Sequence, residues 1–205
     1  MELLEHLLYH ELLDRACPLA DAVHTIEKVL VDRGLIDADA LARQARDLAD
    51  DPDDDAEADR VYGALLVKTL FDRMDTPQIR DIINLSHKET LARRIWLRLR
   101  DEPVDLHEVE RLLQEFAELP VGESQVSPNI AIGIRVQLIS LLISDNLFYI
   151  GVAKSHITMR DVAALMNRFV GKYGQRSRVG GKSAGVILAN RILRPVFGET
   201  TGLED

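Results

Sequence analysis

Apolar residues recur every three or four positions through most of the first 119 residues, and this spacing constrains the fold more than any other feature of the sequence. Side chains with that spacing share one face of an α-helix, which is buried by packing against other helices. We therefore expect residues 1–119 to form a multi-helix bundle. The predicted helices cover residues 2–15, 21–33, 38–48, 60–73, 88–100 and 105–118.

Polar residues and glycine mark the predicted helix ends. Asp21 and Asp37 precede apolar stripes, in the position where a carboxylate can cap the first backbone N–H groups. Gly34 follows the helix over residues 21–33, where a left-handed residue commonly ends a helix. Further along, Thr158 is a suitable cap for a helix that we expect to end near Val170.

Two segments divide the chain in this interpretation. Residues 50–59 hold seven carboxylates, and their mutual repulsion predicts a solvated, extended acidic linker. A boundary is expected between Pro120 and Pro128. Residues 128–170 then form a central apolar helical segment, with a short strand near Phe148 as the less favoured alternative, and residues 171–205 form a Gly-rich basic loop and a helix.

The strongest chemical signal is Gly180-Gly181-Lys182-Ser183, followed by an apolar run that predicts a helix to about Leu193. Glycines allow a ligand to approach the backbone closely, and a helix N-terminus offers unpaired N–H groups with positive partial charge. Lys182 adds a full charge there. The span from Val162 to Phe197 contains seven basic residues and no acidic one, within a chain of net charge −9. This combination predicts a phosphate site.

The residues alone leave two other interpretations open. Gly181-Lys182-Ser183 could be the end of a P-loop, but position 176, where that motif needs glycine, is arginine, and no β-branched strand precedes it. The glycine pair could also be only a turn before an amphipathic helix, with solvated basic residues around it.

Residues 172–185 resemble the opening of the ATP-binding domain of the phosphoenolpyruvate synthase and pyruvate phosphate dikinase family. The upstream stretches 129–139, 148–153 and 157–162 resemble the helical segment before that domain in a bacterial subgroup, so the resemblance covers roughly residues 128–194. It implies an ATP-grasp type of nucleotide-binding lobe, in which Lys182 contacts ATP phosphate, with Gly180, Gly181 and Ser183 beside it.

The family reaction implied by this resemblance couples ATP cleavage, with Mg²⁺, to phosphoryl transfer through a histidine to pyruvate. The sequence offers the phosphate-binding element but no metal carboxylates, phosphohistidine motif or pyruvate-binding domain. We therefore expect a mainly α protein, a helical bundle followed by the truncated start of an ATP-grasp-like α/β lobe. It would be inactive alone, and no catalytic residue or metal ligand is assigned.

The alternative is a stand-alone helical adaptor or regulatory protein that binds a protein partner, and a third possibility is a phosphorylated ligand bound without turnover. The acidic balance argues against general nucleic-acid binding, and no apolar run approaches the length of a membrane span. The acidic N-terminus and the single cysteine, Cys17, favour a cytoplasmic protein. His6 and His10 are one helical turn apart but lack an evident third metal ligand.

Overall fold

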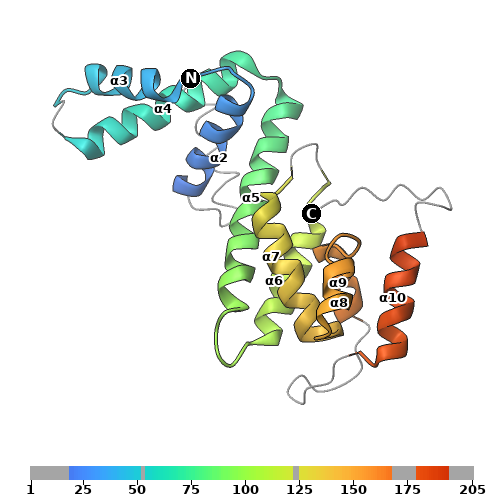
Figure 1. Ribbon diagram of the computed structural model, residues 1–205. Coiled ribbons are helices and arrows are strands. Elements are labelled where there is room, and N and C mark those ends of the chain that lie inside the picture. Colours follow the sequence, from blue (N-terminus) through green and yellow to red (C-terminus); the bar gives the residue numbers. More distant parts are fainter. Residues whose placement is uncertain (1–18, 52–53, 122–124, 168–178, 194–205) are drawn as a thin grey trace. The chain divides into compact units, whose positions relative to one another are not determined.

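The computed structural model describes residues 19–51, 54–121, 125–167 and 179–193, and all regular structure among them is helical (Figure 1). The mainly α class predicted from the apolar spacing is confirmed, and no strand occurs in these ranges. The helices are α2 (Leu19–Asp32), α3 (Ala38–Leu48), α4 (Asp55–Arg73), α5 (Thr76–Arg98), α6 (Leu106–Glu118), α7 (Pro128–Leu138), the π-helix η1 (Ile139–Ile143), α8 (Leu147–Ala153), α9 (Met159–Met166) and α10 (Gly181–Leu193).

The chain divides into two compact units, Met1–Thr90 and Leu91–Asp205, and the division lies inside α5. It does not coincide with the boundary predicted between Pro120 and Pro128. The physical reason is the packing of α6, which contacts α9 and contributes to the core of the second unit. Its apolar stripe was correctly predicted, but the sequence does not indicate which core the stripe joins.

The first unit is built on α4, against which both α2 and α3 pack. A polar network joins α2 to α5 within this unit. The Thr25 hydroxyl donates to Glu89 Oε2 at 3.0 Å, Lys28 Nζ lies 3.2 Å from Glu89 Oε1, and Thr90 Oγ1 donates to Asp21 Oδ2 at 3.2 Å. The core of the unit comprises Ala22, Ile26, Val29, Leu30, Leu66, Leu70, Met74, Ile82, Ile83 and Leu85.

The turn between α2 and α3 has the predicted glycine and cap. Gly34 has φ +66°, and the N–H of Leu35 returns to the carbonyl of Leu30 at 2.9 Å. Only a residue without a side chain adopts that left-handed conformation without strain. Asp37 then caps α3 by accepting from the N–H of Ala40 at 3.0 Å.

Two predicted helices begin earlier than the apolar stripes indicate. The expected acidic linker over 50–59 is wrong for residues 55–59, which form the first turns of α4. Asp54 caps this helix by accepting from the N–H groups of Ala56 and Glu57. The acidic side chains of the first turn interact favourably with the positive end of the helix dipole and so stabilise the helix. The helix predicted over 88–100 is the second half of α5, whose start at Thr76 is stabilised by reciprocal bonds between Asp75 and Gln78.

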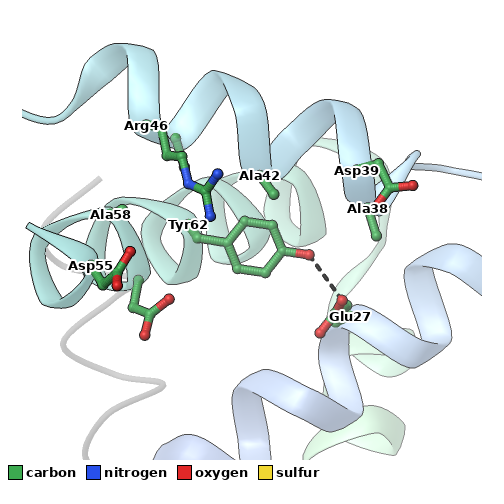
Figure 2. A pocket seen from close by; sticks show the side chains of 10 residues that line it. Glu27, Ala38, Asp39, Ala42, Arg46, Asp55, Ala58 and Tyr62 are labelled. Atoms are coloured by element: carbon green, nitrogen blue, oxygen red, sulfur yellow. Dashed lines mark hydrogen bonds between the residues drawn. The ribbon is translucent and has the colours of Figure 1, made fainter. Parts of the chain in front are cut away.

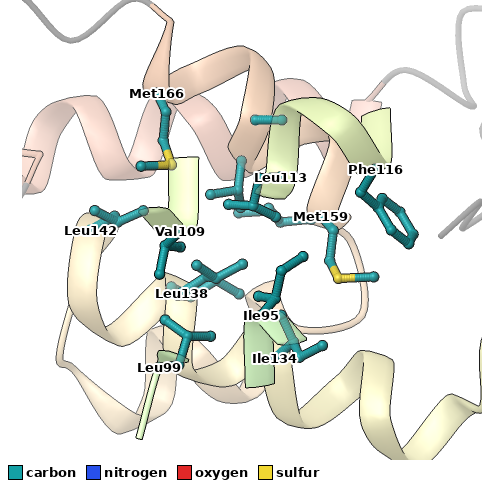
Figure 3. Close-up of a cluster of buried hydrophobic side chains, with 14 of the residues drawn as sticks. Ile95, Leu99, Val109, Leu113, Phe116, Ile134, Leu138, Leu142, Met159 and Met166 are labelled. Carbon is teal, nitrogen blue, oxygen red and sulfur yellow. The ribbon is translucent and has the colours of Figure 1, made fainter. Parts of the chain in front are cut away.

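The second unit surrounds an apolar core drawn from α5 through α10 (Figure 3). The predicted central apolar segment is confirmed as helical: it runs through α7 into η1 and then, after a break at Ser144, into α8. The largest fully buried side chains of this unit are Leu91, Ile95, Leu112, Leu113, Phe116, Ile134, Leu138 and Ile139.

Thr158 caps α9 as predicted, and a reciprocal bond from its own N–H to Asp161 completes the capping box. The predicted helix over 2–15, and the expected end near Val170, lie outside the described residues. Among the helices of the described ranges, none combines the length and apolar character needed to cross a membrane.

Candidate phosphate-binding site

The four predicted site residues lie together at the N-terminus of α10, and all four are exposed. The helix begins at Gly181, and its first backbone bond runs from the N–H of Ala184 to the carbonyl of Gly180 at 3.0 Å. The N–H groups of Gly181, Lys182 and Ser183 therefore occupy the first turn, where an α-helix provides no intrahelical acceptor. The predicted helix from the glycine pair to Leu193 is confirmed.

Charge at this turn comes from the helix and from Lys182. Three N–H groups and the positive end of the helix dipole point out of the first turn, and the Lys182 side chain extends from its second residue. Arg191, at the other end of α10, instead pairs with Asp161. The other basic residues of the window, Arg168, Lys172, Arg176, Arg178 and Arg194, lie outside the described residues.

The glycines at this turn are not required by the backbone conformation. Gly34 is the positive-φ glycine among the described residues, so neither Gly180 nor Gly181 adopts a left-handed conformation. A methyl group added at either position would meet no atom within 4 Å. Among the described residues the space above both glycines is open, so a ligand could approach the backbone there, and no packing contact requires their small size.

Two hydrogen bonds fix the turn to the rest of the second unit, one on each side of it. Before the turn, the N–H of Val179 donates to the carbonyl of Leu142 in η1 at 3.0 Å. After it, the Tyr149 hydroxyl of α8 donates to the carbonyl of Ala184 at 2.8 Å. Burial raises the pKa of the Tyr149 hydroxyl, so it remains a donor across the physiological range.

Apolar contacts hold the inner face of α10 at the same place. Ala184 is only 3% exposed and belongs to the core of the second unit, and Ile187 and Leu188 pack against that core. The exposed residues Gly180 to Ser183 are thus presented from a helix whose inner face, first turn and last turn are all attached. Sequence reasoning missed Tyr149, although a tyrosine within an apolar stretch indicates a buried hydroxyl that needs a partner.

A separate cavity of about 270 Å³ lies in the first unit, between α2, α3 and α4 (Figure 2). Its lining includes Ala42, Ala45 and Ala58, together with the carboxylates of Glu27, Asp39, Asp55 and Asp59, the guanidinium of Arg46 and the Tyr62 ring. Four carboxylates around one guanidinium repel a phosphate. We therefore assign no nucleotide group to this cavity.

The described residues supply groups that suit ATP phosphates but no cluster that suits Mg²⁺. The turn at Gly180–Ser183 supplies N–H donors and an ammonium group, which suit phosphate oxygens. No group of three His, Cys, Asp or Glu side chains that could hold a metal occurs among the described residues, and Asp161 is already paired with Arg191. The described residues therefore include donors that suit phosphate oxygens, and no cluster of these side chains that suits Mg²⁺. His6, His10 and Cys17 lie outside the described residues.

Comparison of the chain with protein-family models, with curated proteins and with solved structures gives no match. Function is therefore inferred from the geometry of the turn and from the sequence around it.

Proposed function

We propose that this chain is the helical region and first phosphate-binding element of an ATP-dependent phosphotransferase similar to phosphoenolpyruvate synthase and pyruvate phosphate dikinase. In this proposal the turn at Gly180–Ser183 is the start of an ATP-grasp-like lobe and binds nucleotide phosphate. Mg²⁺ would arrive with the nucleotide. In this proposal the chemical step needs further parts of the enzyme, so the chain by itself would bind without turnover.

The observation that carries the proposal is the exposed, firmly attached turn at the N-terminus of α10. Three first-turn N–H groups, the Lys182 ammonium and two glycines with open space above them occur together. Each feature favours an anion, and the glycines additionally let phosphate oxygens reach the backbone. The family resemblance of residues 172–185 supports a nucleotide as the anion.

Titration calorimetry of the purified chain with Mg-ATP tests this proposal. We expect wild-type binding that is lost or strongly weakened in Lys182→Ala. Lys68→Ala is the matched control, because it removes the same charge from an exposed position on α4 in the other unit. Absence of ATP and phosphate binding in the wild type, or equal loss in both variants, contradicts the assignment.

A second pair of variants tests the role of the open glycines. Gly181→Ala should weaken Mg-ATP binding without lowering stability, because its methyl group occupies space that only a ligand would need. Gly151→Ala, on α8, is the control, since that glycine also has nothing within 4 Å. Unchanged binding in Gly181→Ala would exclude close approach of a ligand to this backbone.

The second candidate function is the helical adaptor, and one observation favours it. Leu147 and Phe148 at the start of α8 are 84% and 86% exposed, which is unusual for large apolar side chains. An adaptor would leave the calorimetric titration with Mg-ATP flat. Binding of a protein partner that is lost in the double variant Leu147→Ser, Phe148→Ser would then support it.

A further inference from the structure

We infer that Tyr149 is a positioning residue for the phosphate-binding turn, acting through the carbonyl of Ala184. This inference rests on the proposed function, because the turn that Tyr149 orients is the proposed phosphate site. Tyr149 itself does not belong to the exposed turn. Its hydroxyl donates to a backbone carbonyl one residue after that turn, at 2.8 Å.

The arrangement at η1 explains why one short segment can hold both sides of the turn. In η1 the N–H of Ser144 bonds back to the carbonyl of Ile139 at 2.8 Å, five residues earlier, as a π-helix does. The carbonyl of Leu142, near the end of this helix, accepts from Val179 at 3.0 Å. Carbonyls in the last turn of a helix lack intrahelical donors, so this one is free to hold another segment.

Tyr149 completes the attachment from the next helix. Asn146 caps α8 by accepting from the N–H groups of Phe148 and Tyr149, which fixes the start of this helix. Tyr149 then reaches α10, whereas its neighbour Phe148 is exposed. The segment from Leu142 to Tyr149 thus attaches the chain directly before Gly180 and directly after Ser183.

Loosening the attachment of the turn should lower its apparent affinity for phosphate. A phosphate group that binds three adjacent N–H groups needs them held in one geometry, and apparent affinity falls with the fraction of molecules in that geometry. Removing one hydrogen bond that holds the turn changes that equilibrium by about two- to twelvefold, from the net strength of a typical protein hydrogen bond. We therefore expect Tyr149→Phe to weaken Mg-ATP binding by up to about tenfold.

The experiment combines two measurements on the full chain. Hydrogen exchange followed by mass spectrometry reports the opening of the two hydrogen-bonded N–H groups that flank the turn, those of Val179 and Ala184, and calorimetry with Mg-ATP reports affinity. Tyr149→Phe should accelerate exchange in peptides covering that turn and weaken Mg-ATP binding. Tyr62→Phe is the matched control, because it removes a similar hydroxyl bond, to Glu27 at 3.0 Å, in the first unit.

The outcomes separate this inference from the proposed function. Faster exchange at the turn with weaker ATP binding in Tyr149→Phe alone supports both. Wild-type binding that Tyr149→Phe leaves unchanged overturns the positioning role and leaves the phosphate site standing. Faster exchange at the turn in a chain that binds neither ATP nor phosphate overturns the proposed function, whereas the attachment of the turn by Tyr149 would stand. Equal changes in Tyr149→Phe and Tyr62→Phe also overturn the positioning role, because they would report only a general loss of stability.

Discussion

Gly133 on α7 lies so close to the indole ring of Trp96 on α5 that a methyl group on the glycine would approach the Trp96 Cζ3 atom to 2.9 Å. The same methyl group would come within 3.3 Å of Cη2. Both residues belong to the second unit, so the contact sets how closely these two helices pack within it. The glycine is therefore required by the tertiary contact and not by its own backbone conformation.

Replacing Gly133 by alanine should destabilise the protein relative to a matched substitution in open space. Alanine gains about 0.5–1 kcal/mol over glycine inside a helix, and Gly151→Ala on α8 should show that gain, because nothing lies within 4 Å. In Gly133→Ala the same gain is opposed by the collision of the new methyl group with the Trp96 ring, because overpacking costs about 1–3 kcal/mol. Denaturant unfolding of the two variants measures the difference. Equal stability would contradict the close packing of α7 on Trp96.

Phe116 and Phe148 are a buried and an exposed phenylalanine of the second unit, so the stabilities of their alanine variants can be compared. Phe116 on α6 is 0% exposed and packs in the second core (Figure 3). The Arg160 guanidinium lies 5.6 Å from its ring centre. Phe116→Ala should cost about 3–5 kcal/mol of unfolding free energy, because it leaves a large cavity. Phe148→Ala should change stability by no more than about 0.5 kcal/mol, because that ring is 86% exposed.

Thermal and denaturant unfolding of both phenylalanine variants provide the test. Arg160 also donates to the carbonyls of Ala117 and Leu119, at 2.6 and 2.7 Å, and so holds the end of α6. The Phe116 cavity is thus bounded by a fixed charged group, which limits how far the surroundings can collapse. A cost for Phe116→Ala similar to that of Phe148→Ala would contradict the assignment of α6 to the second core.

The hydroxyl of Thr25 should contribute measurably to the first unit. Its Oγ1 lies 3.0 Å from the buried Glu89 carboxylate and also 3.0 Å from the carbonyl of Asp21, one turn earlier. A hydrogen bond to a charged group contributes about 1.5–3 kcal/mol. Thr25→Val keeps the side-chain shape and removes the donor, so we expect a loss in that range. Thr69→Val is the control, since the Thr69 hydroxyl bonds only one turn back, to the carbonyl of Leu65 at 2.8 Å, and should change stability by no more than about 0.5 kcal/mol.

Unfolding of these two threonine variants in urea gives the comparison. A smaller effect at Thr25 than at Thr69 would mean that the bond between α2 and α5 adds nothing to the stability of the unit.

Local features of the fold could be predicted from the sequence, and long-range ones could not. Gly34, Asp37 and Thr158 stand where predicted, because a cap depends on residues within one turn. Asp21, predicted as a cap, lies instead within the first turn of α2. The start of α4 was missed because Asp55–Asp59 were interpreted by their mutual repulsion, whereas at a helix N-terminus the same charges are favourable.

The largest difference between the predicted and the observed fold concerns α5. Every residue of this helix from Ile82 to Ala92 is buried, including Asn84, Lys88 and Glu89. Apolar spacing assigns polar positions to a solvated face, so the sequence gives no signal for a helix buried on all sides. Burial of such residues becomes possible only through partners on other elements, such as Thr25 for Glu89.

At the candidate site the sequence located the turn and its helix, which are local, and missed their attachment, which is not. Tyr149 lies 35 residues before its partner Ala184, and Leu142 is similarly distant from Val179. No spacing rule connects these positions. The role of Lys182, Gly180, Gly181 and Ser183 in phosphate binding remains a prediction.

The stability of the first unit should fall at high pH because of Tyr62. Burial raises the pKa of this hydroxyl to about 12, from 10.0, and its hydrogen bond to Glu27 and the charges of Glu27 and Asp39 act in the same direction. A group with a raised pKa in the folded state contributes stability that is fully present below its unfolded pKa. That contribution is lost as pH rises from about 10 through about 12, because ionisation then favours the unfolded chain.

Tyr62→Phe tests this dependence directly. The variant lacks the ionisable group, so its unfolding free energy should fall less steeply between pH 10 and 12 than that of the wild type. Phe148→Leu, at an exposed position without an ionisable side chain, should retain the wild-type slope. Denaturant unfolding at several pH values over this range provides the slopes. The fall of unfolding free energy with pH follows from the raised pKa of Tyr62. If the wild-type free energy fell no more steeply than that of Tyr62→Phe, the Tyr62 hydroxyl would be solvated and would not donate to Glu27.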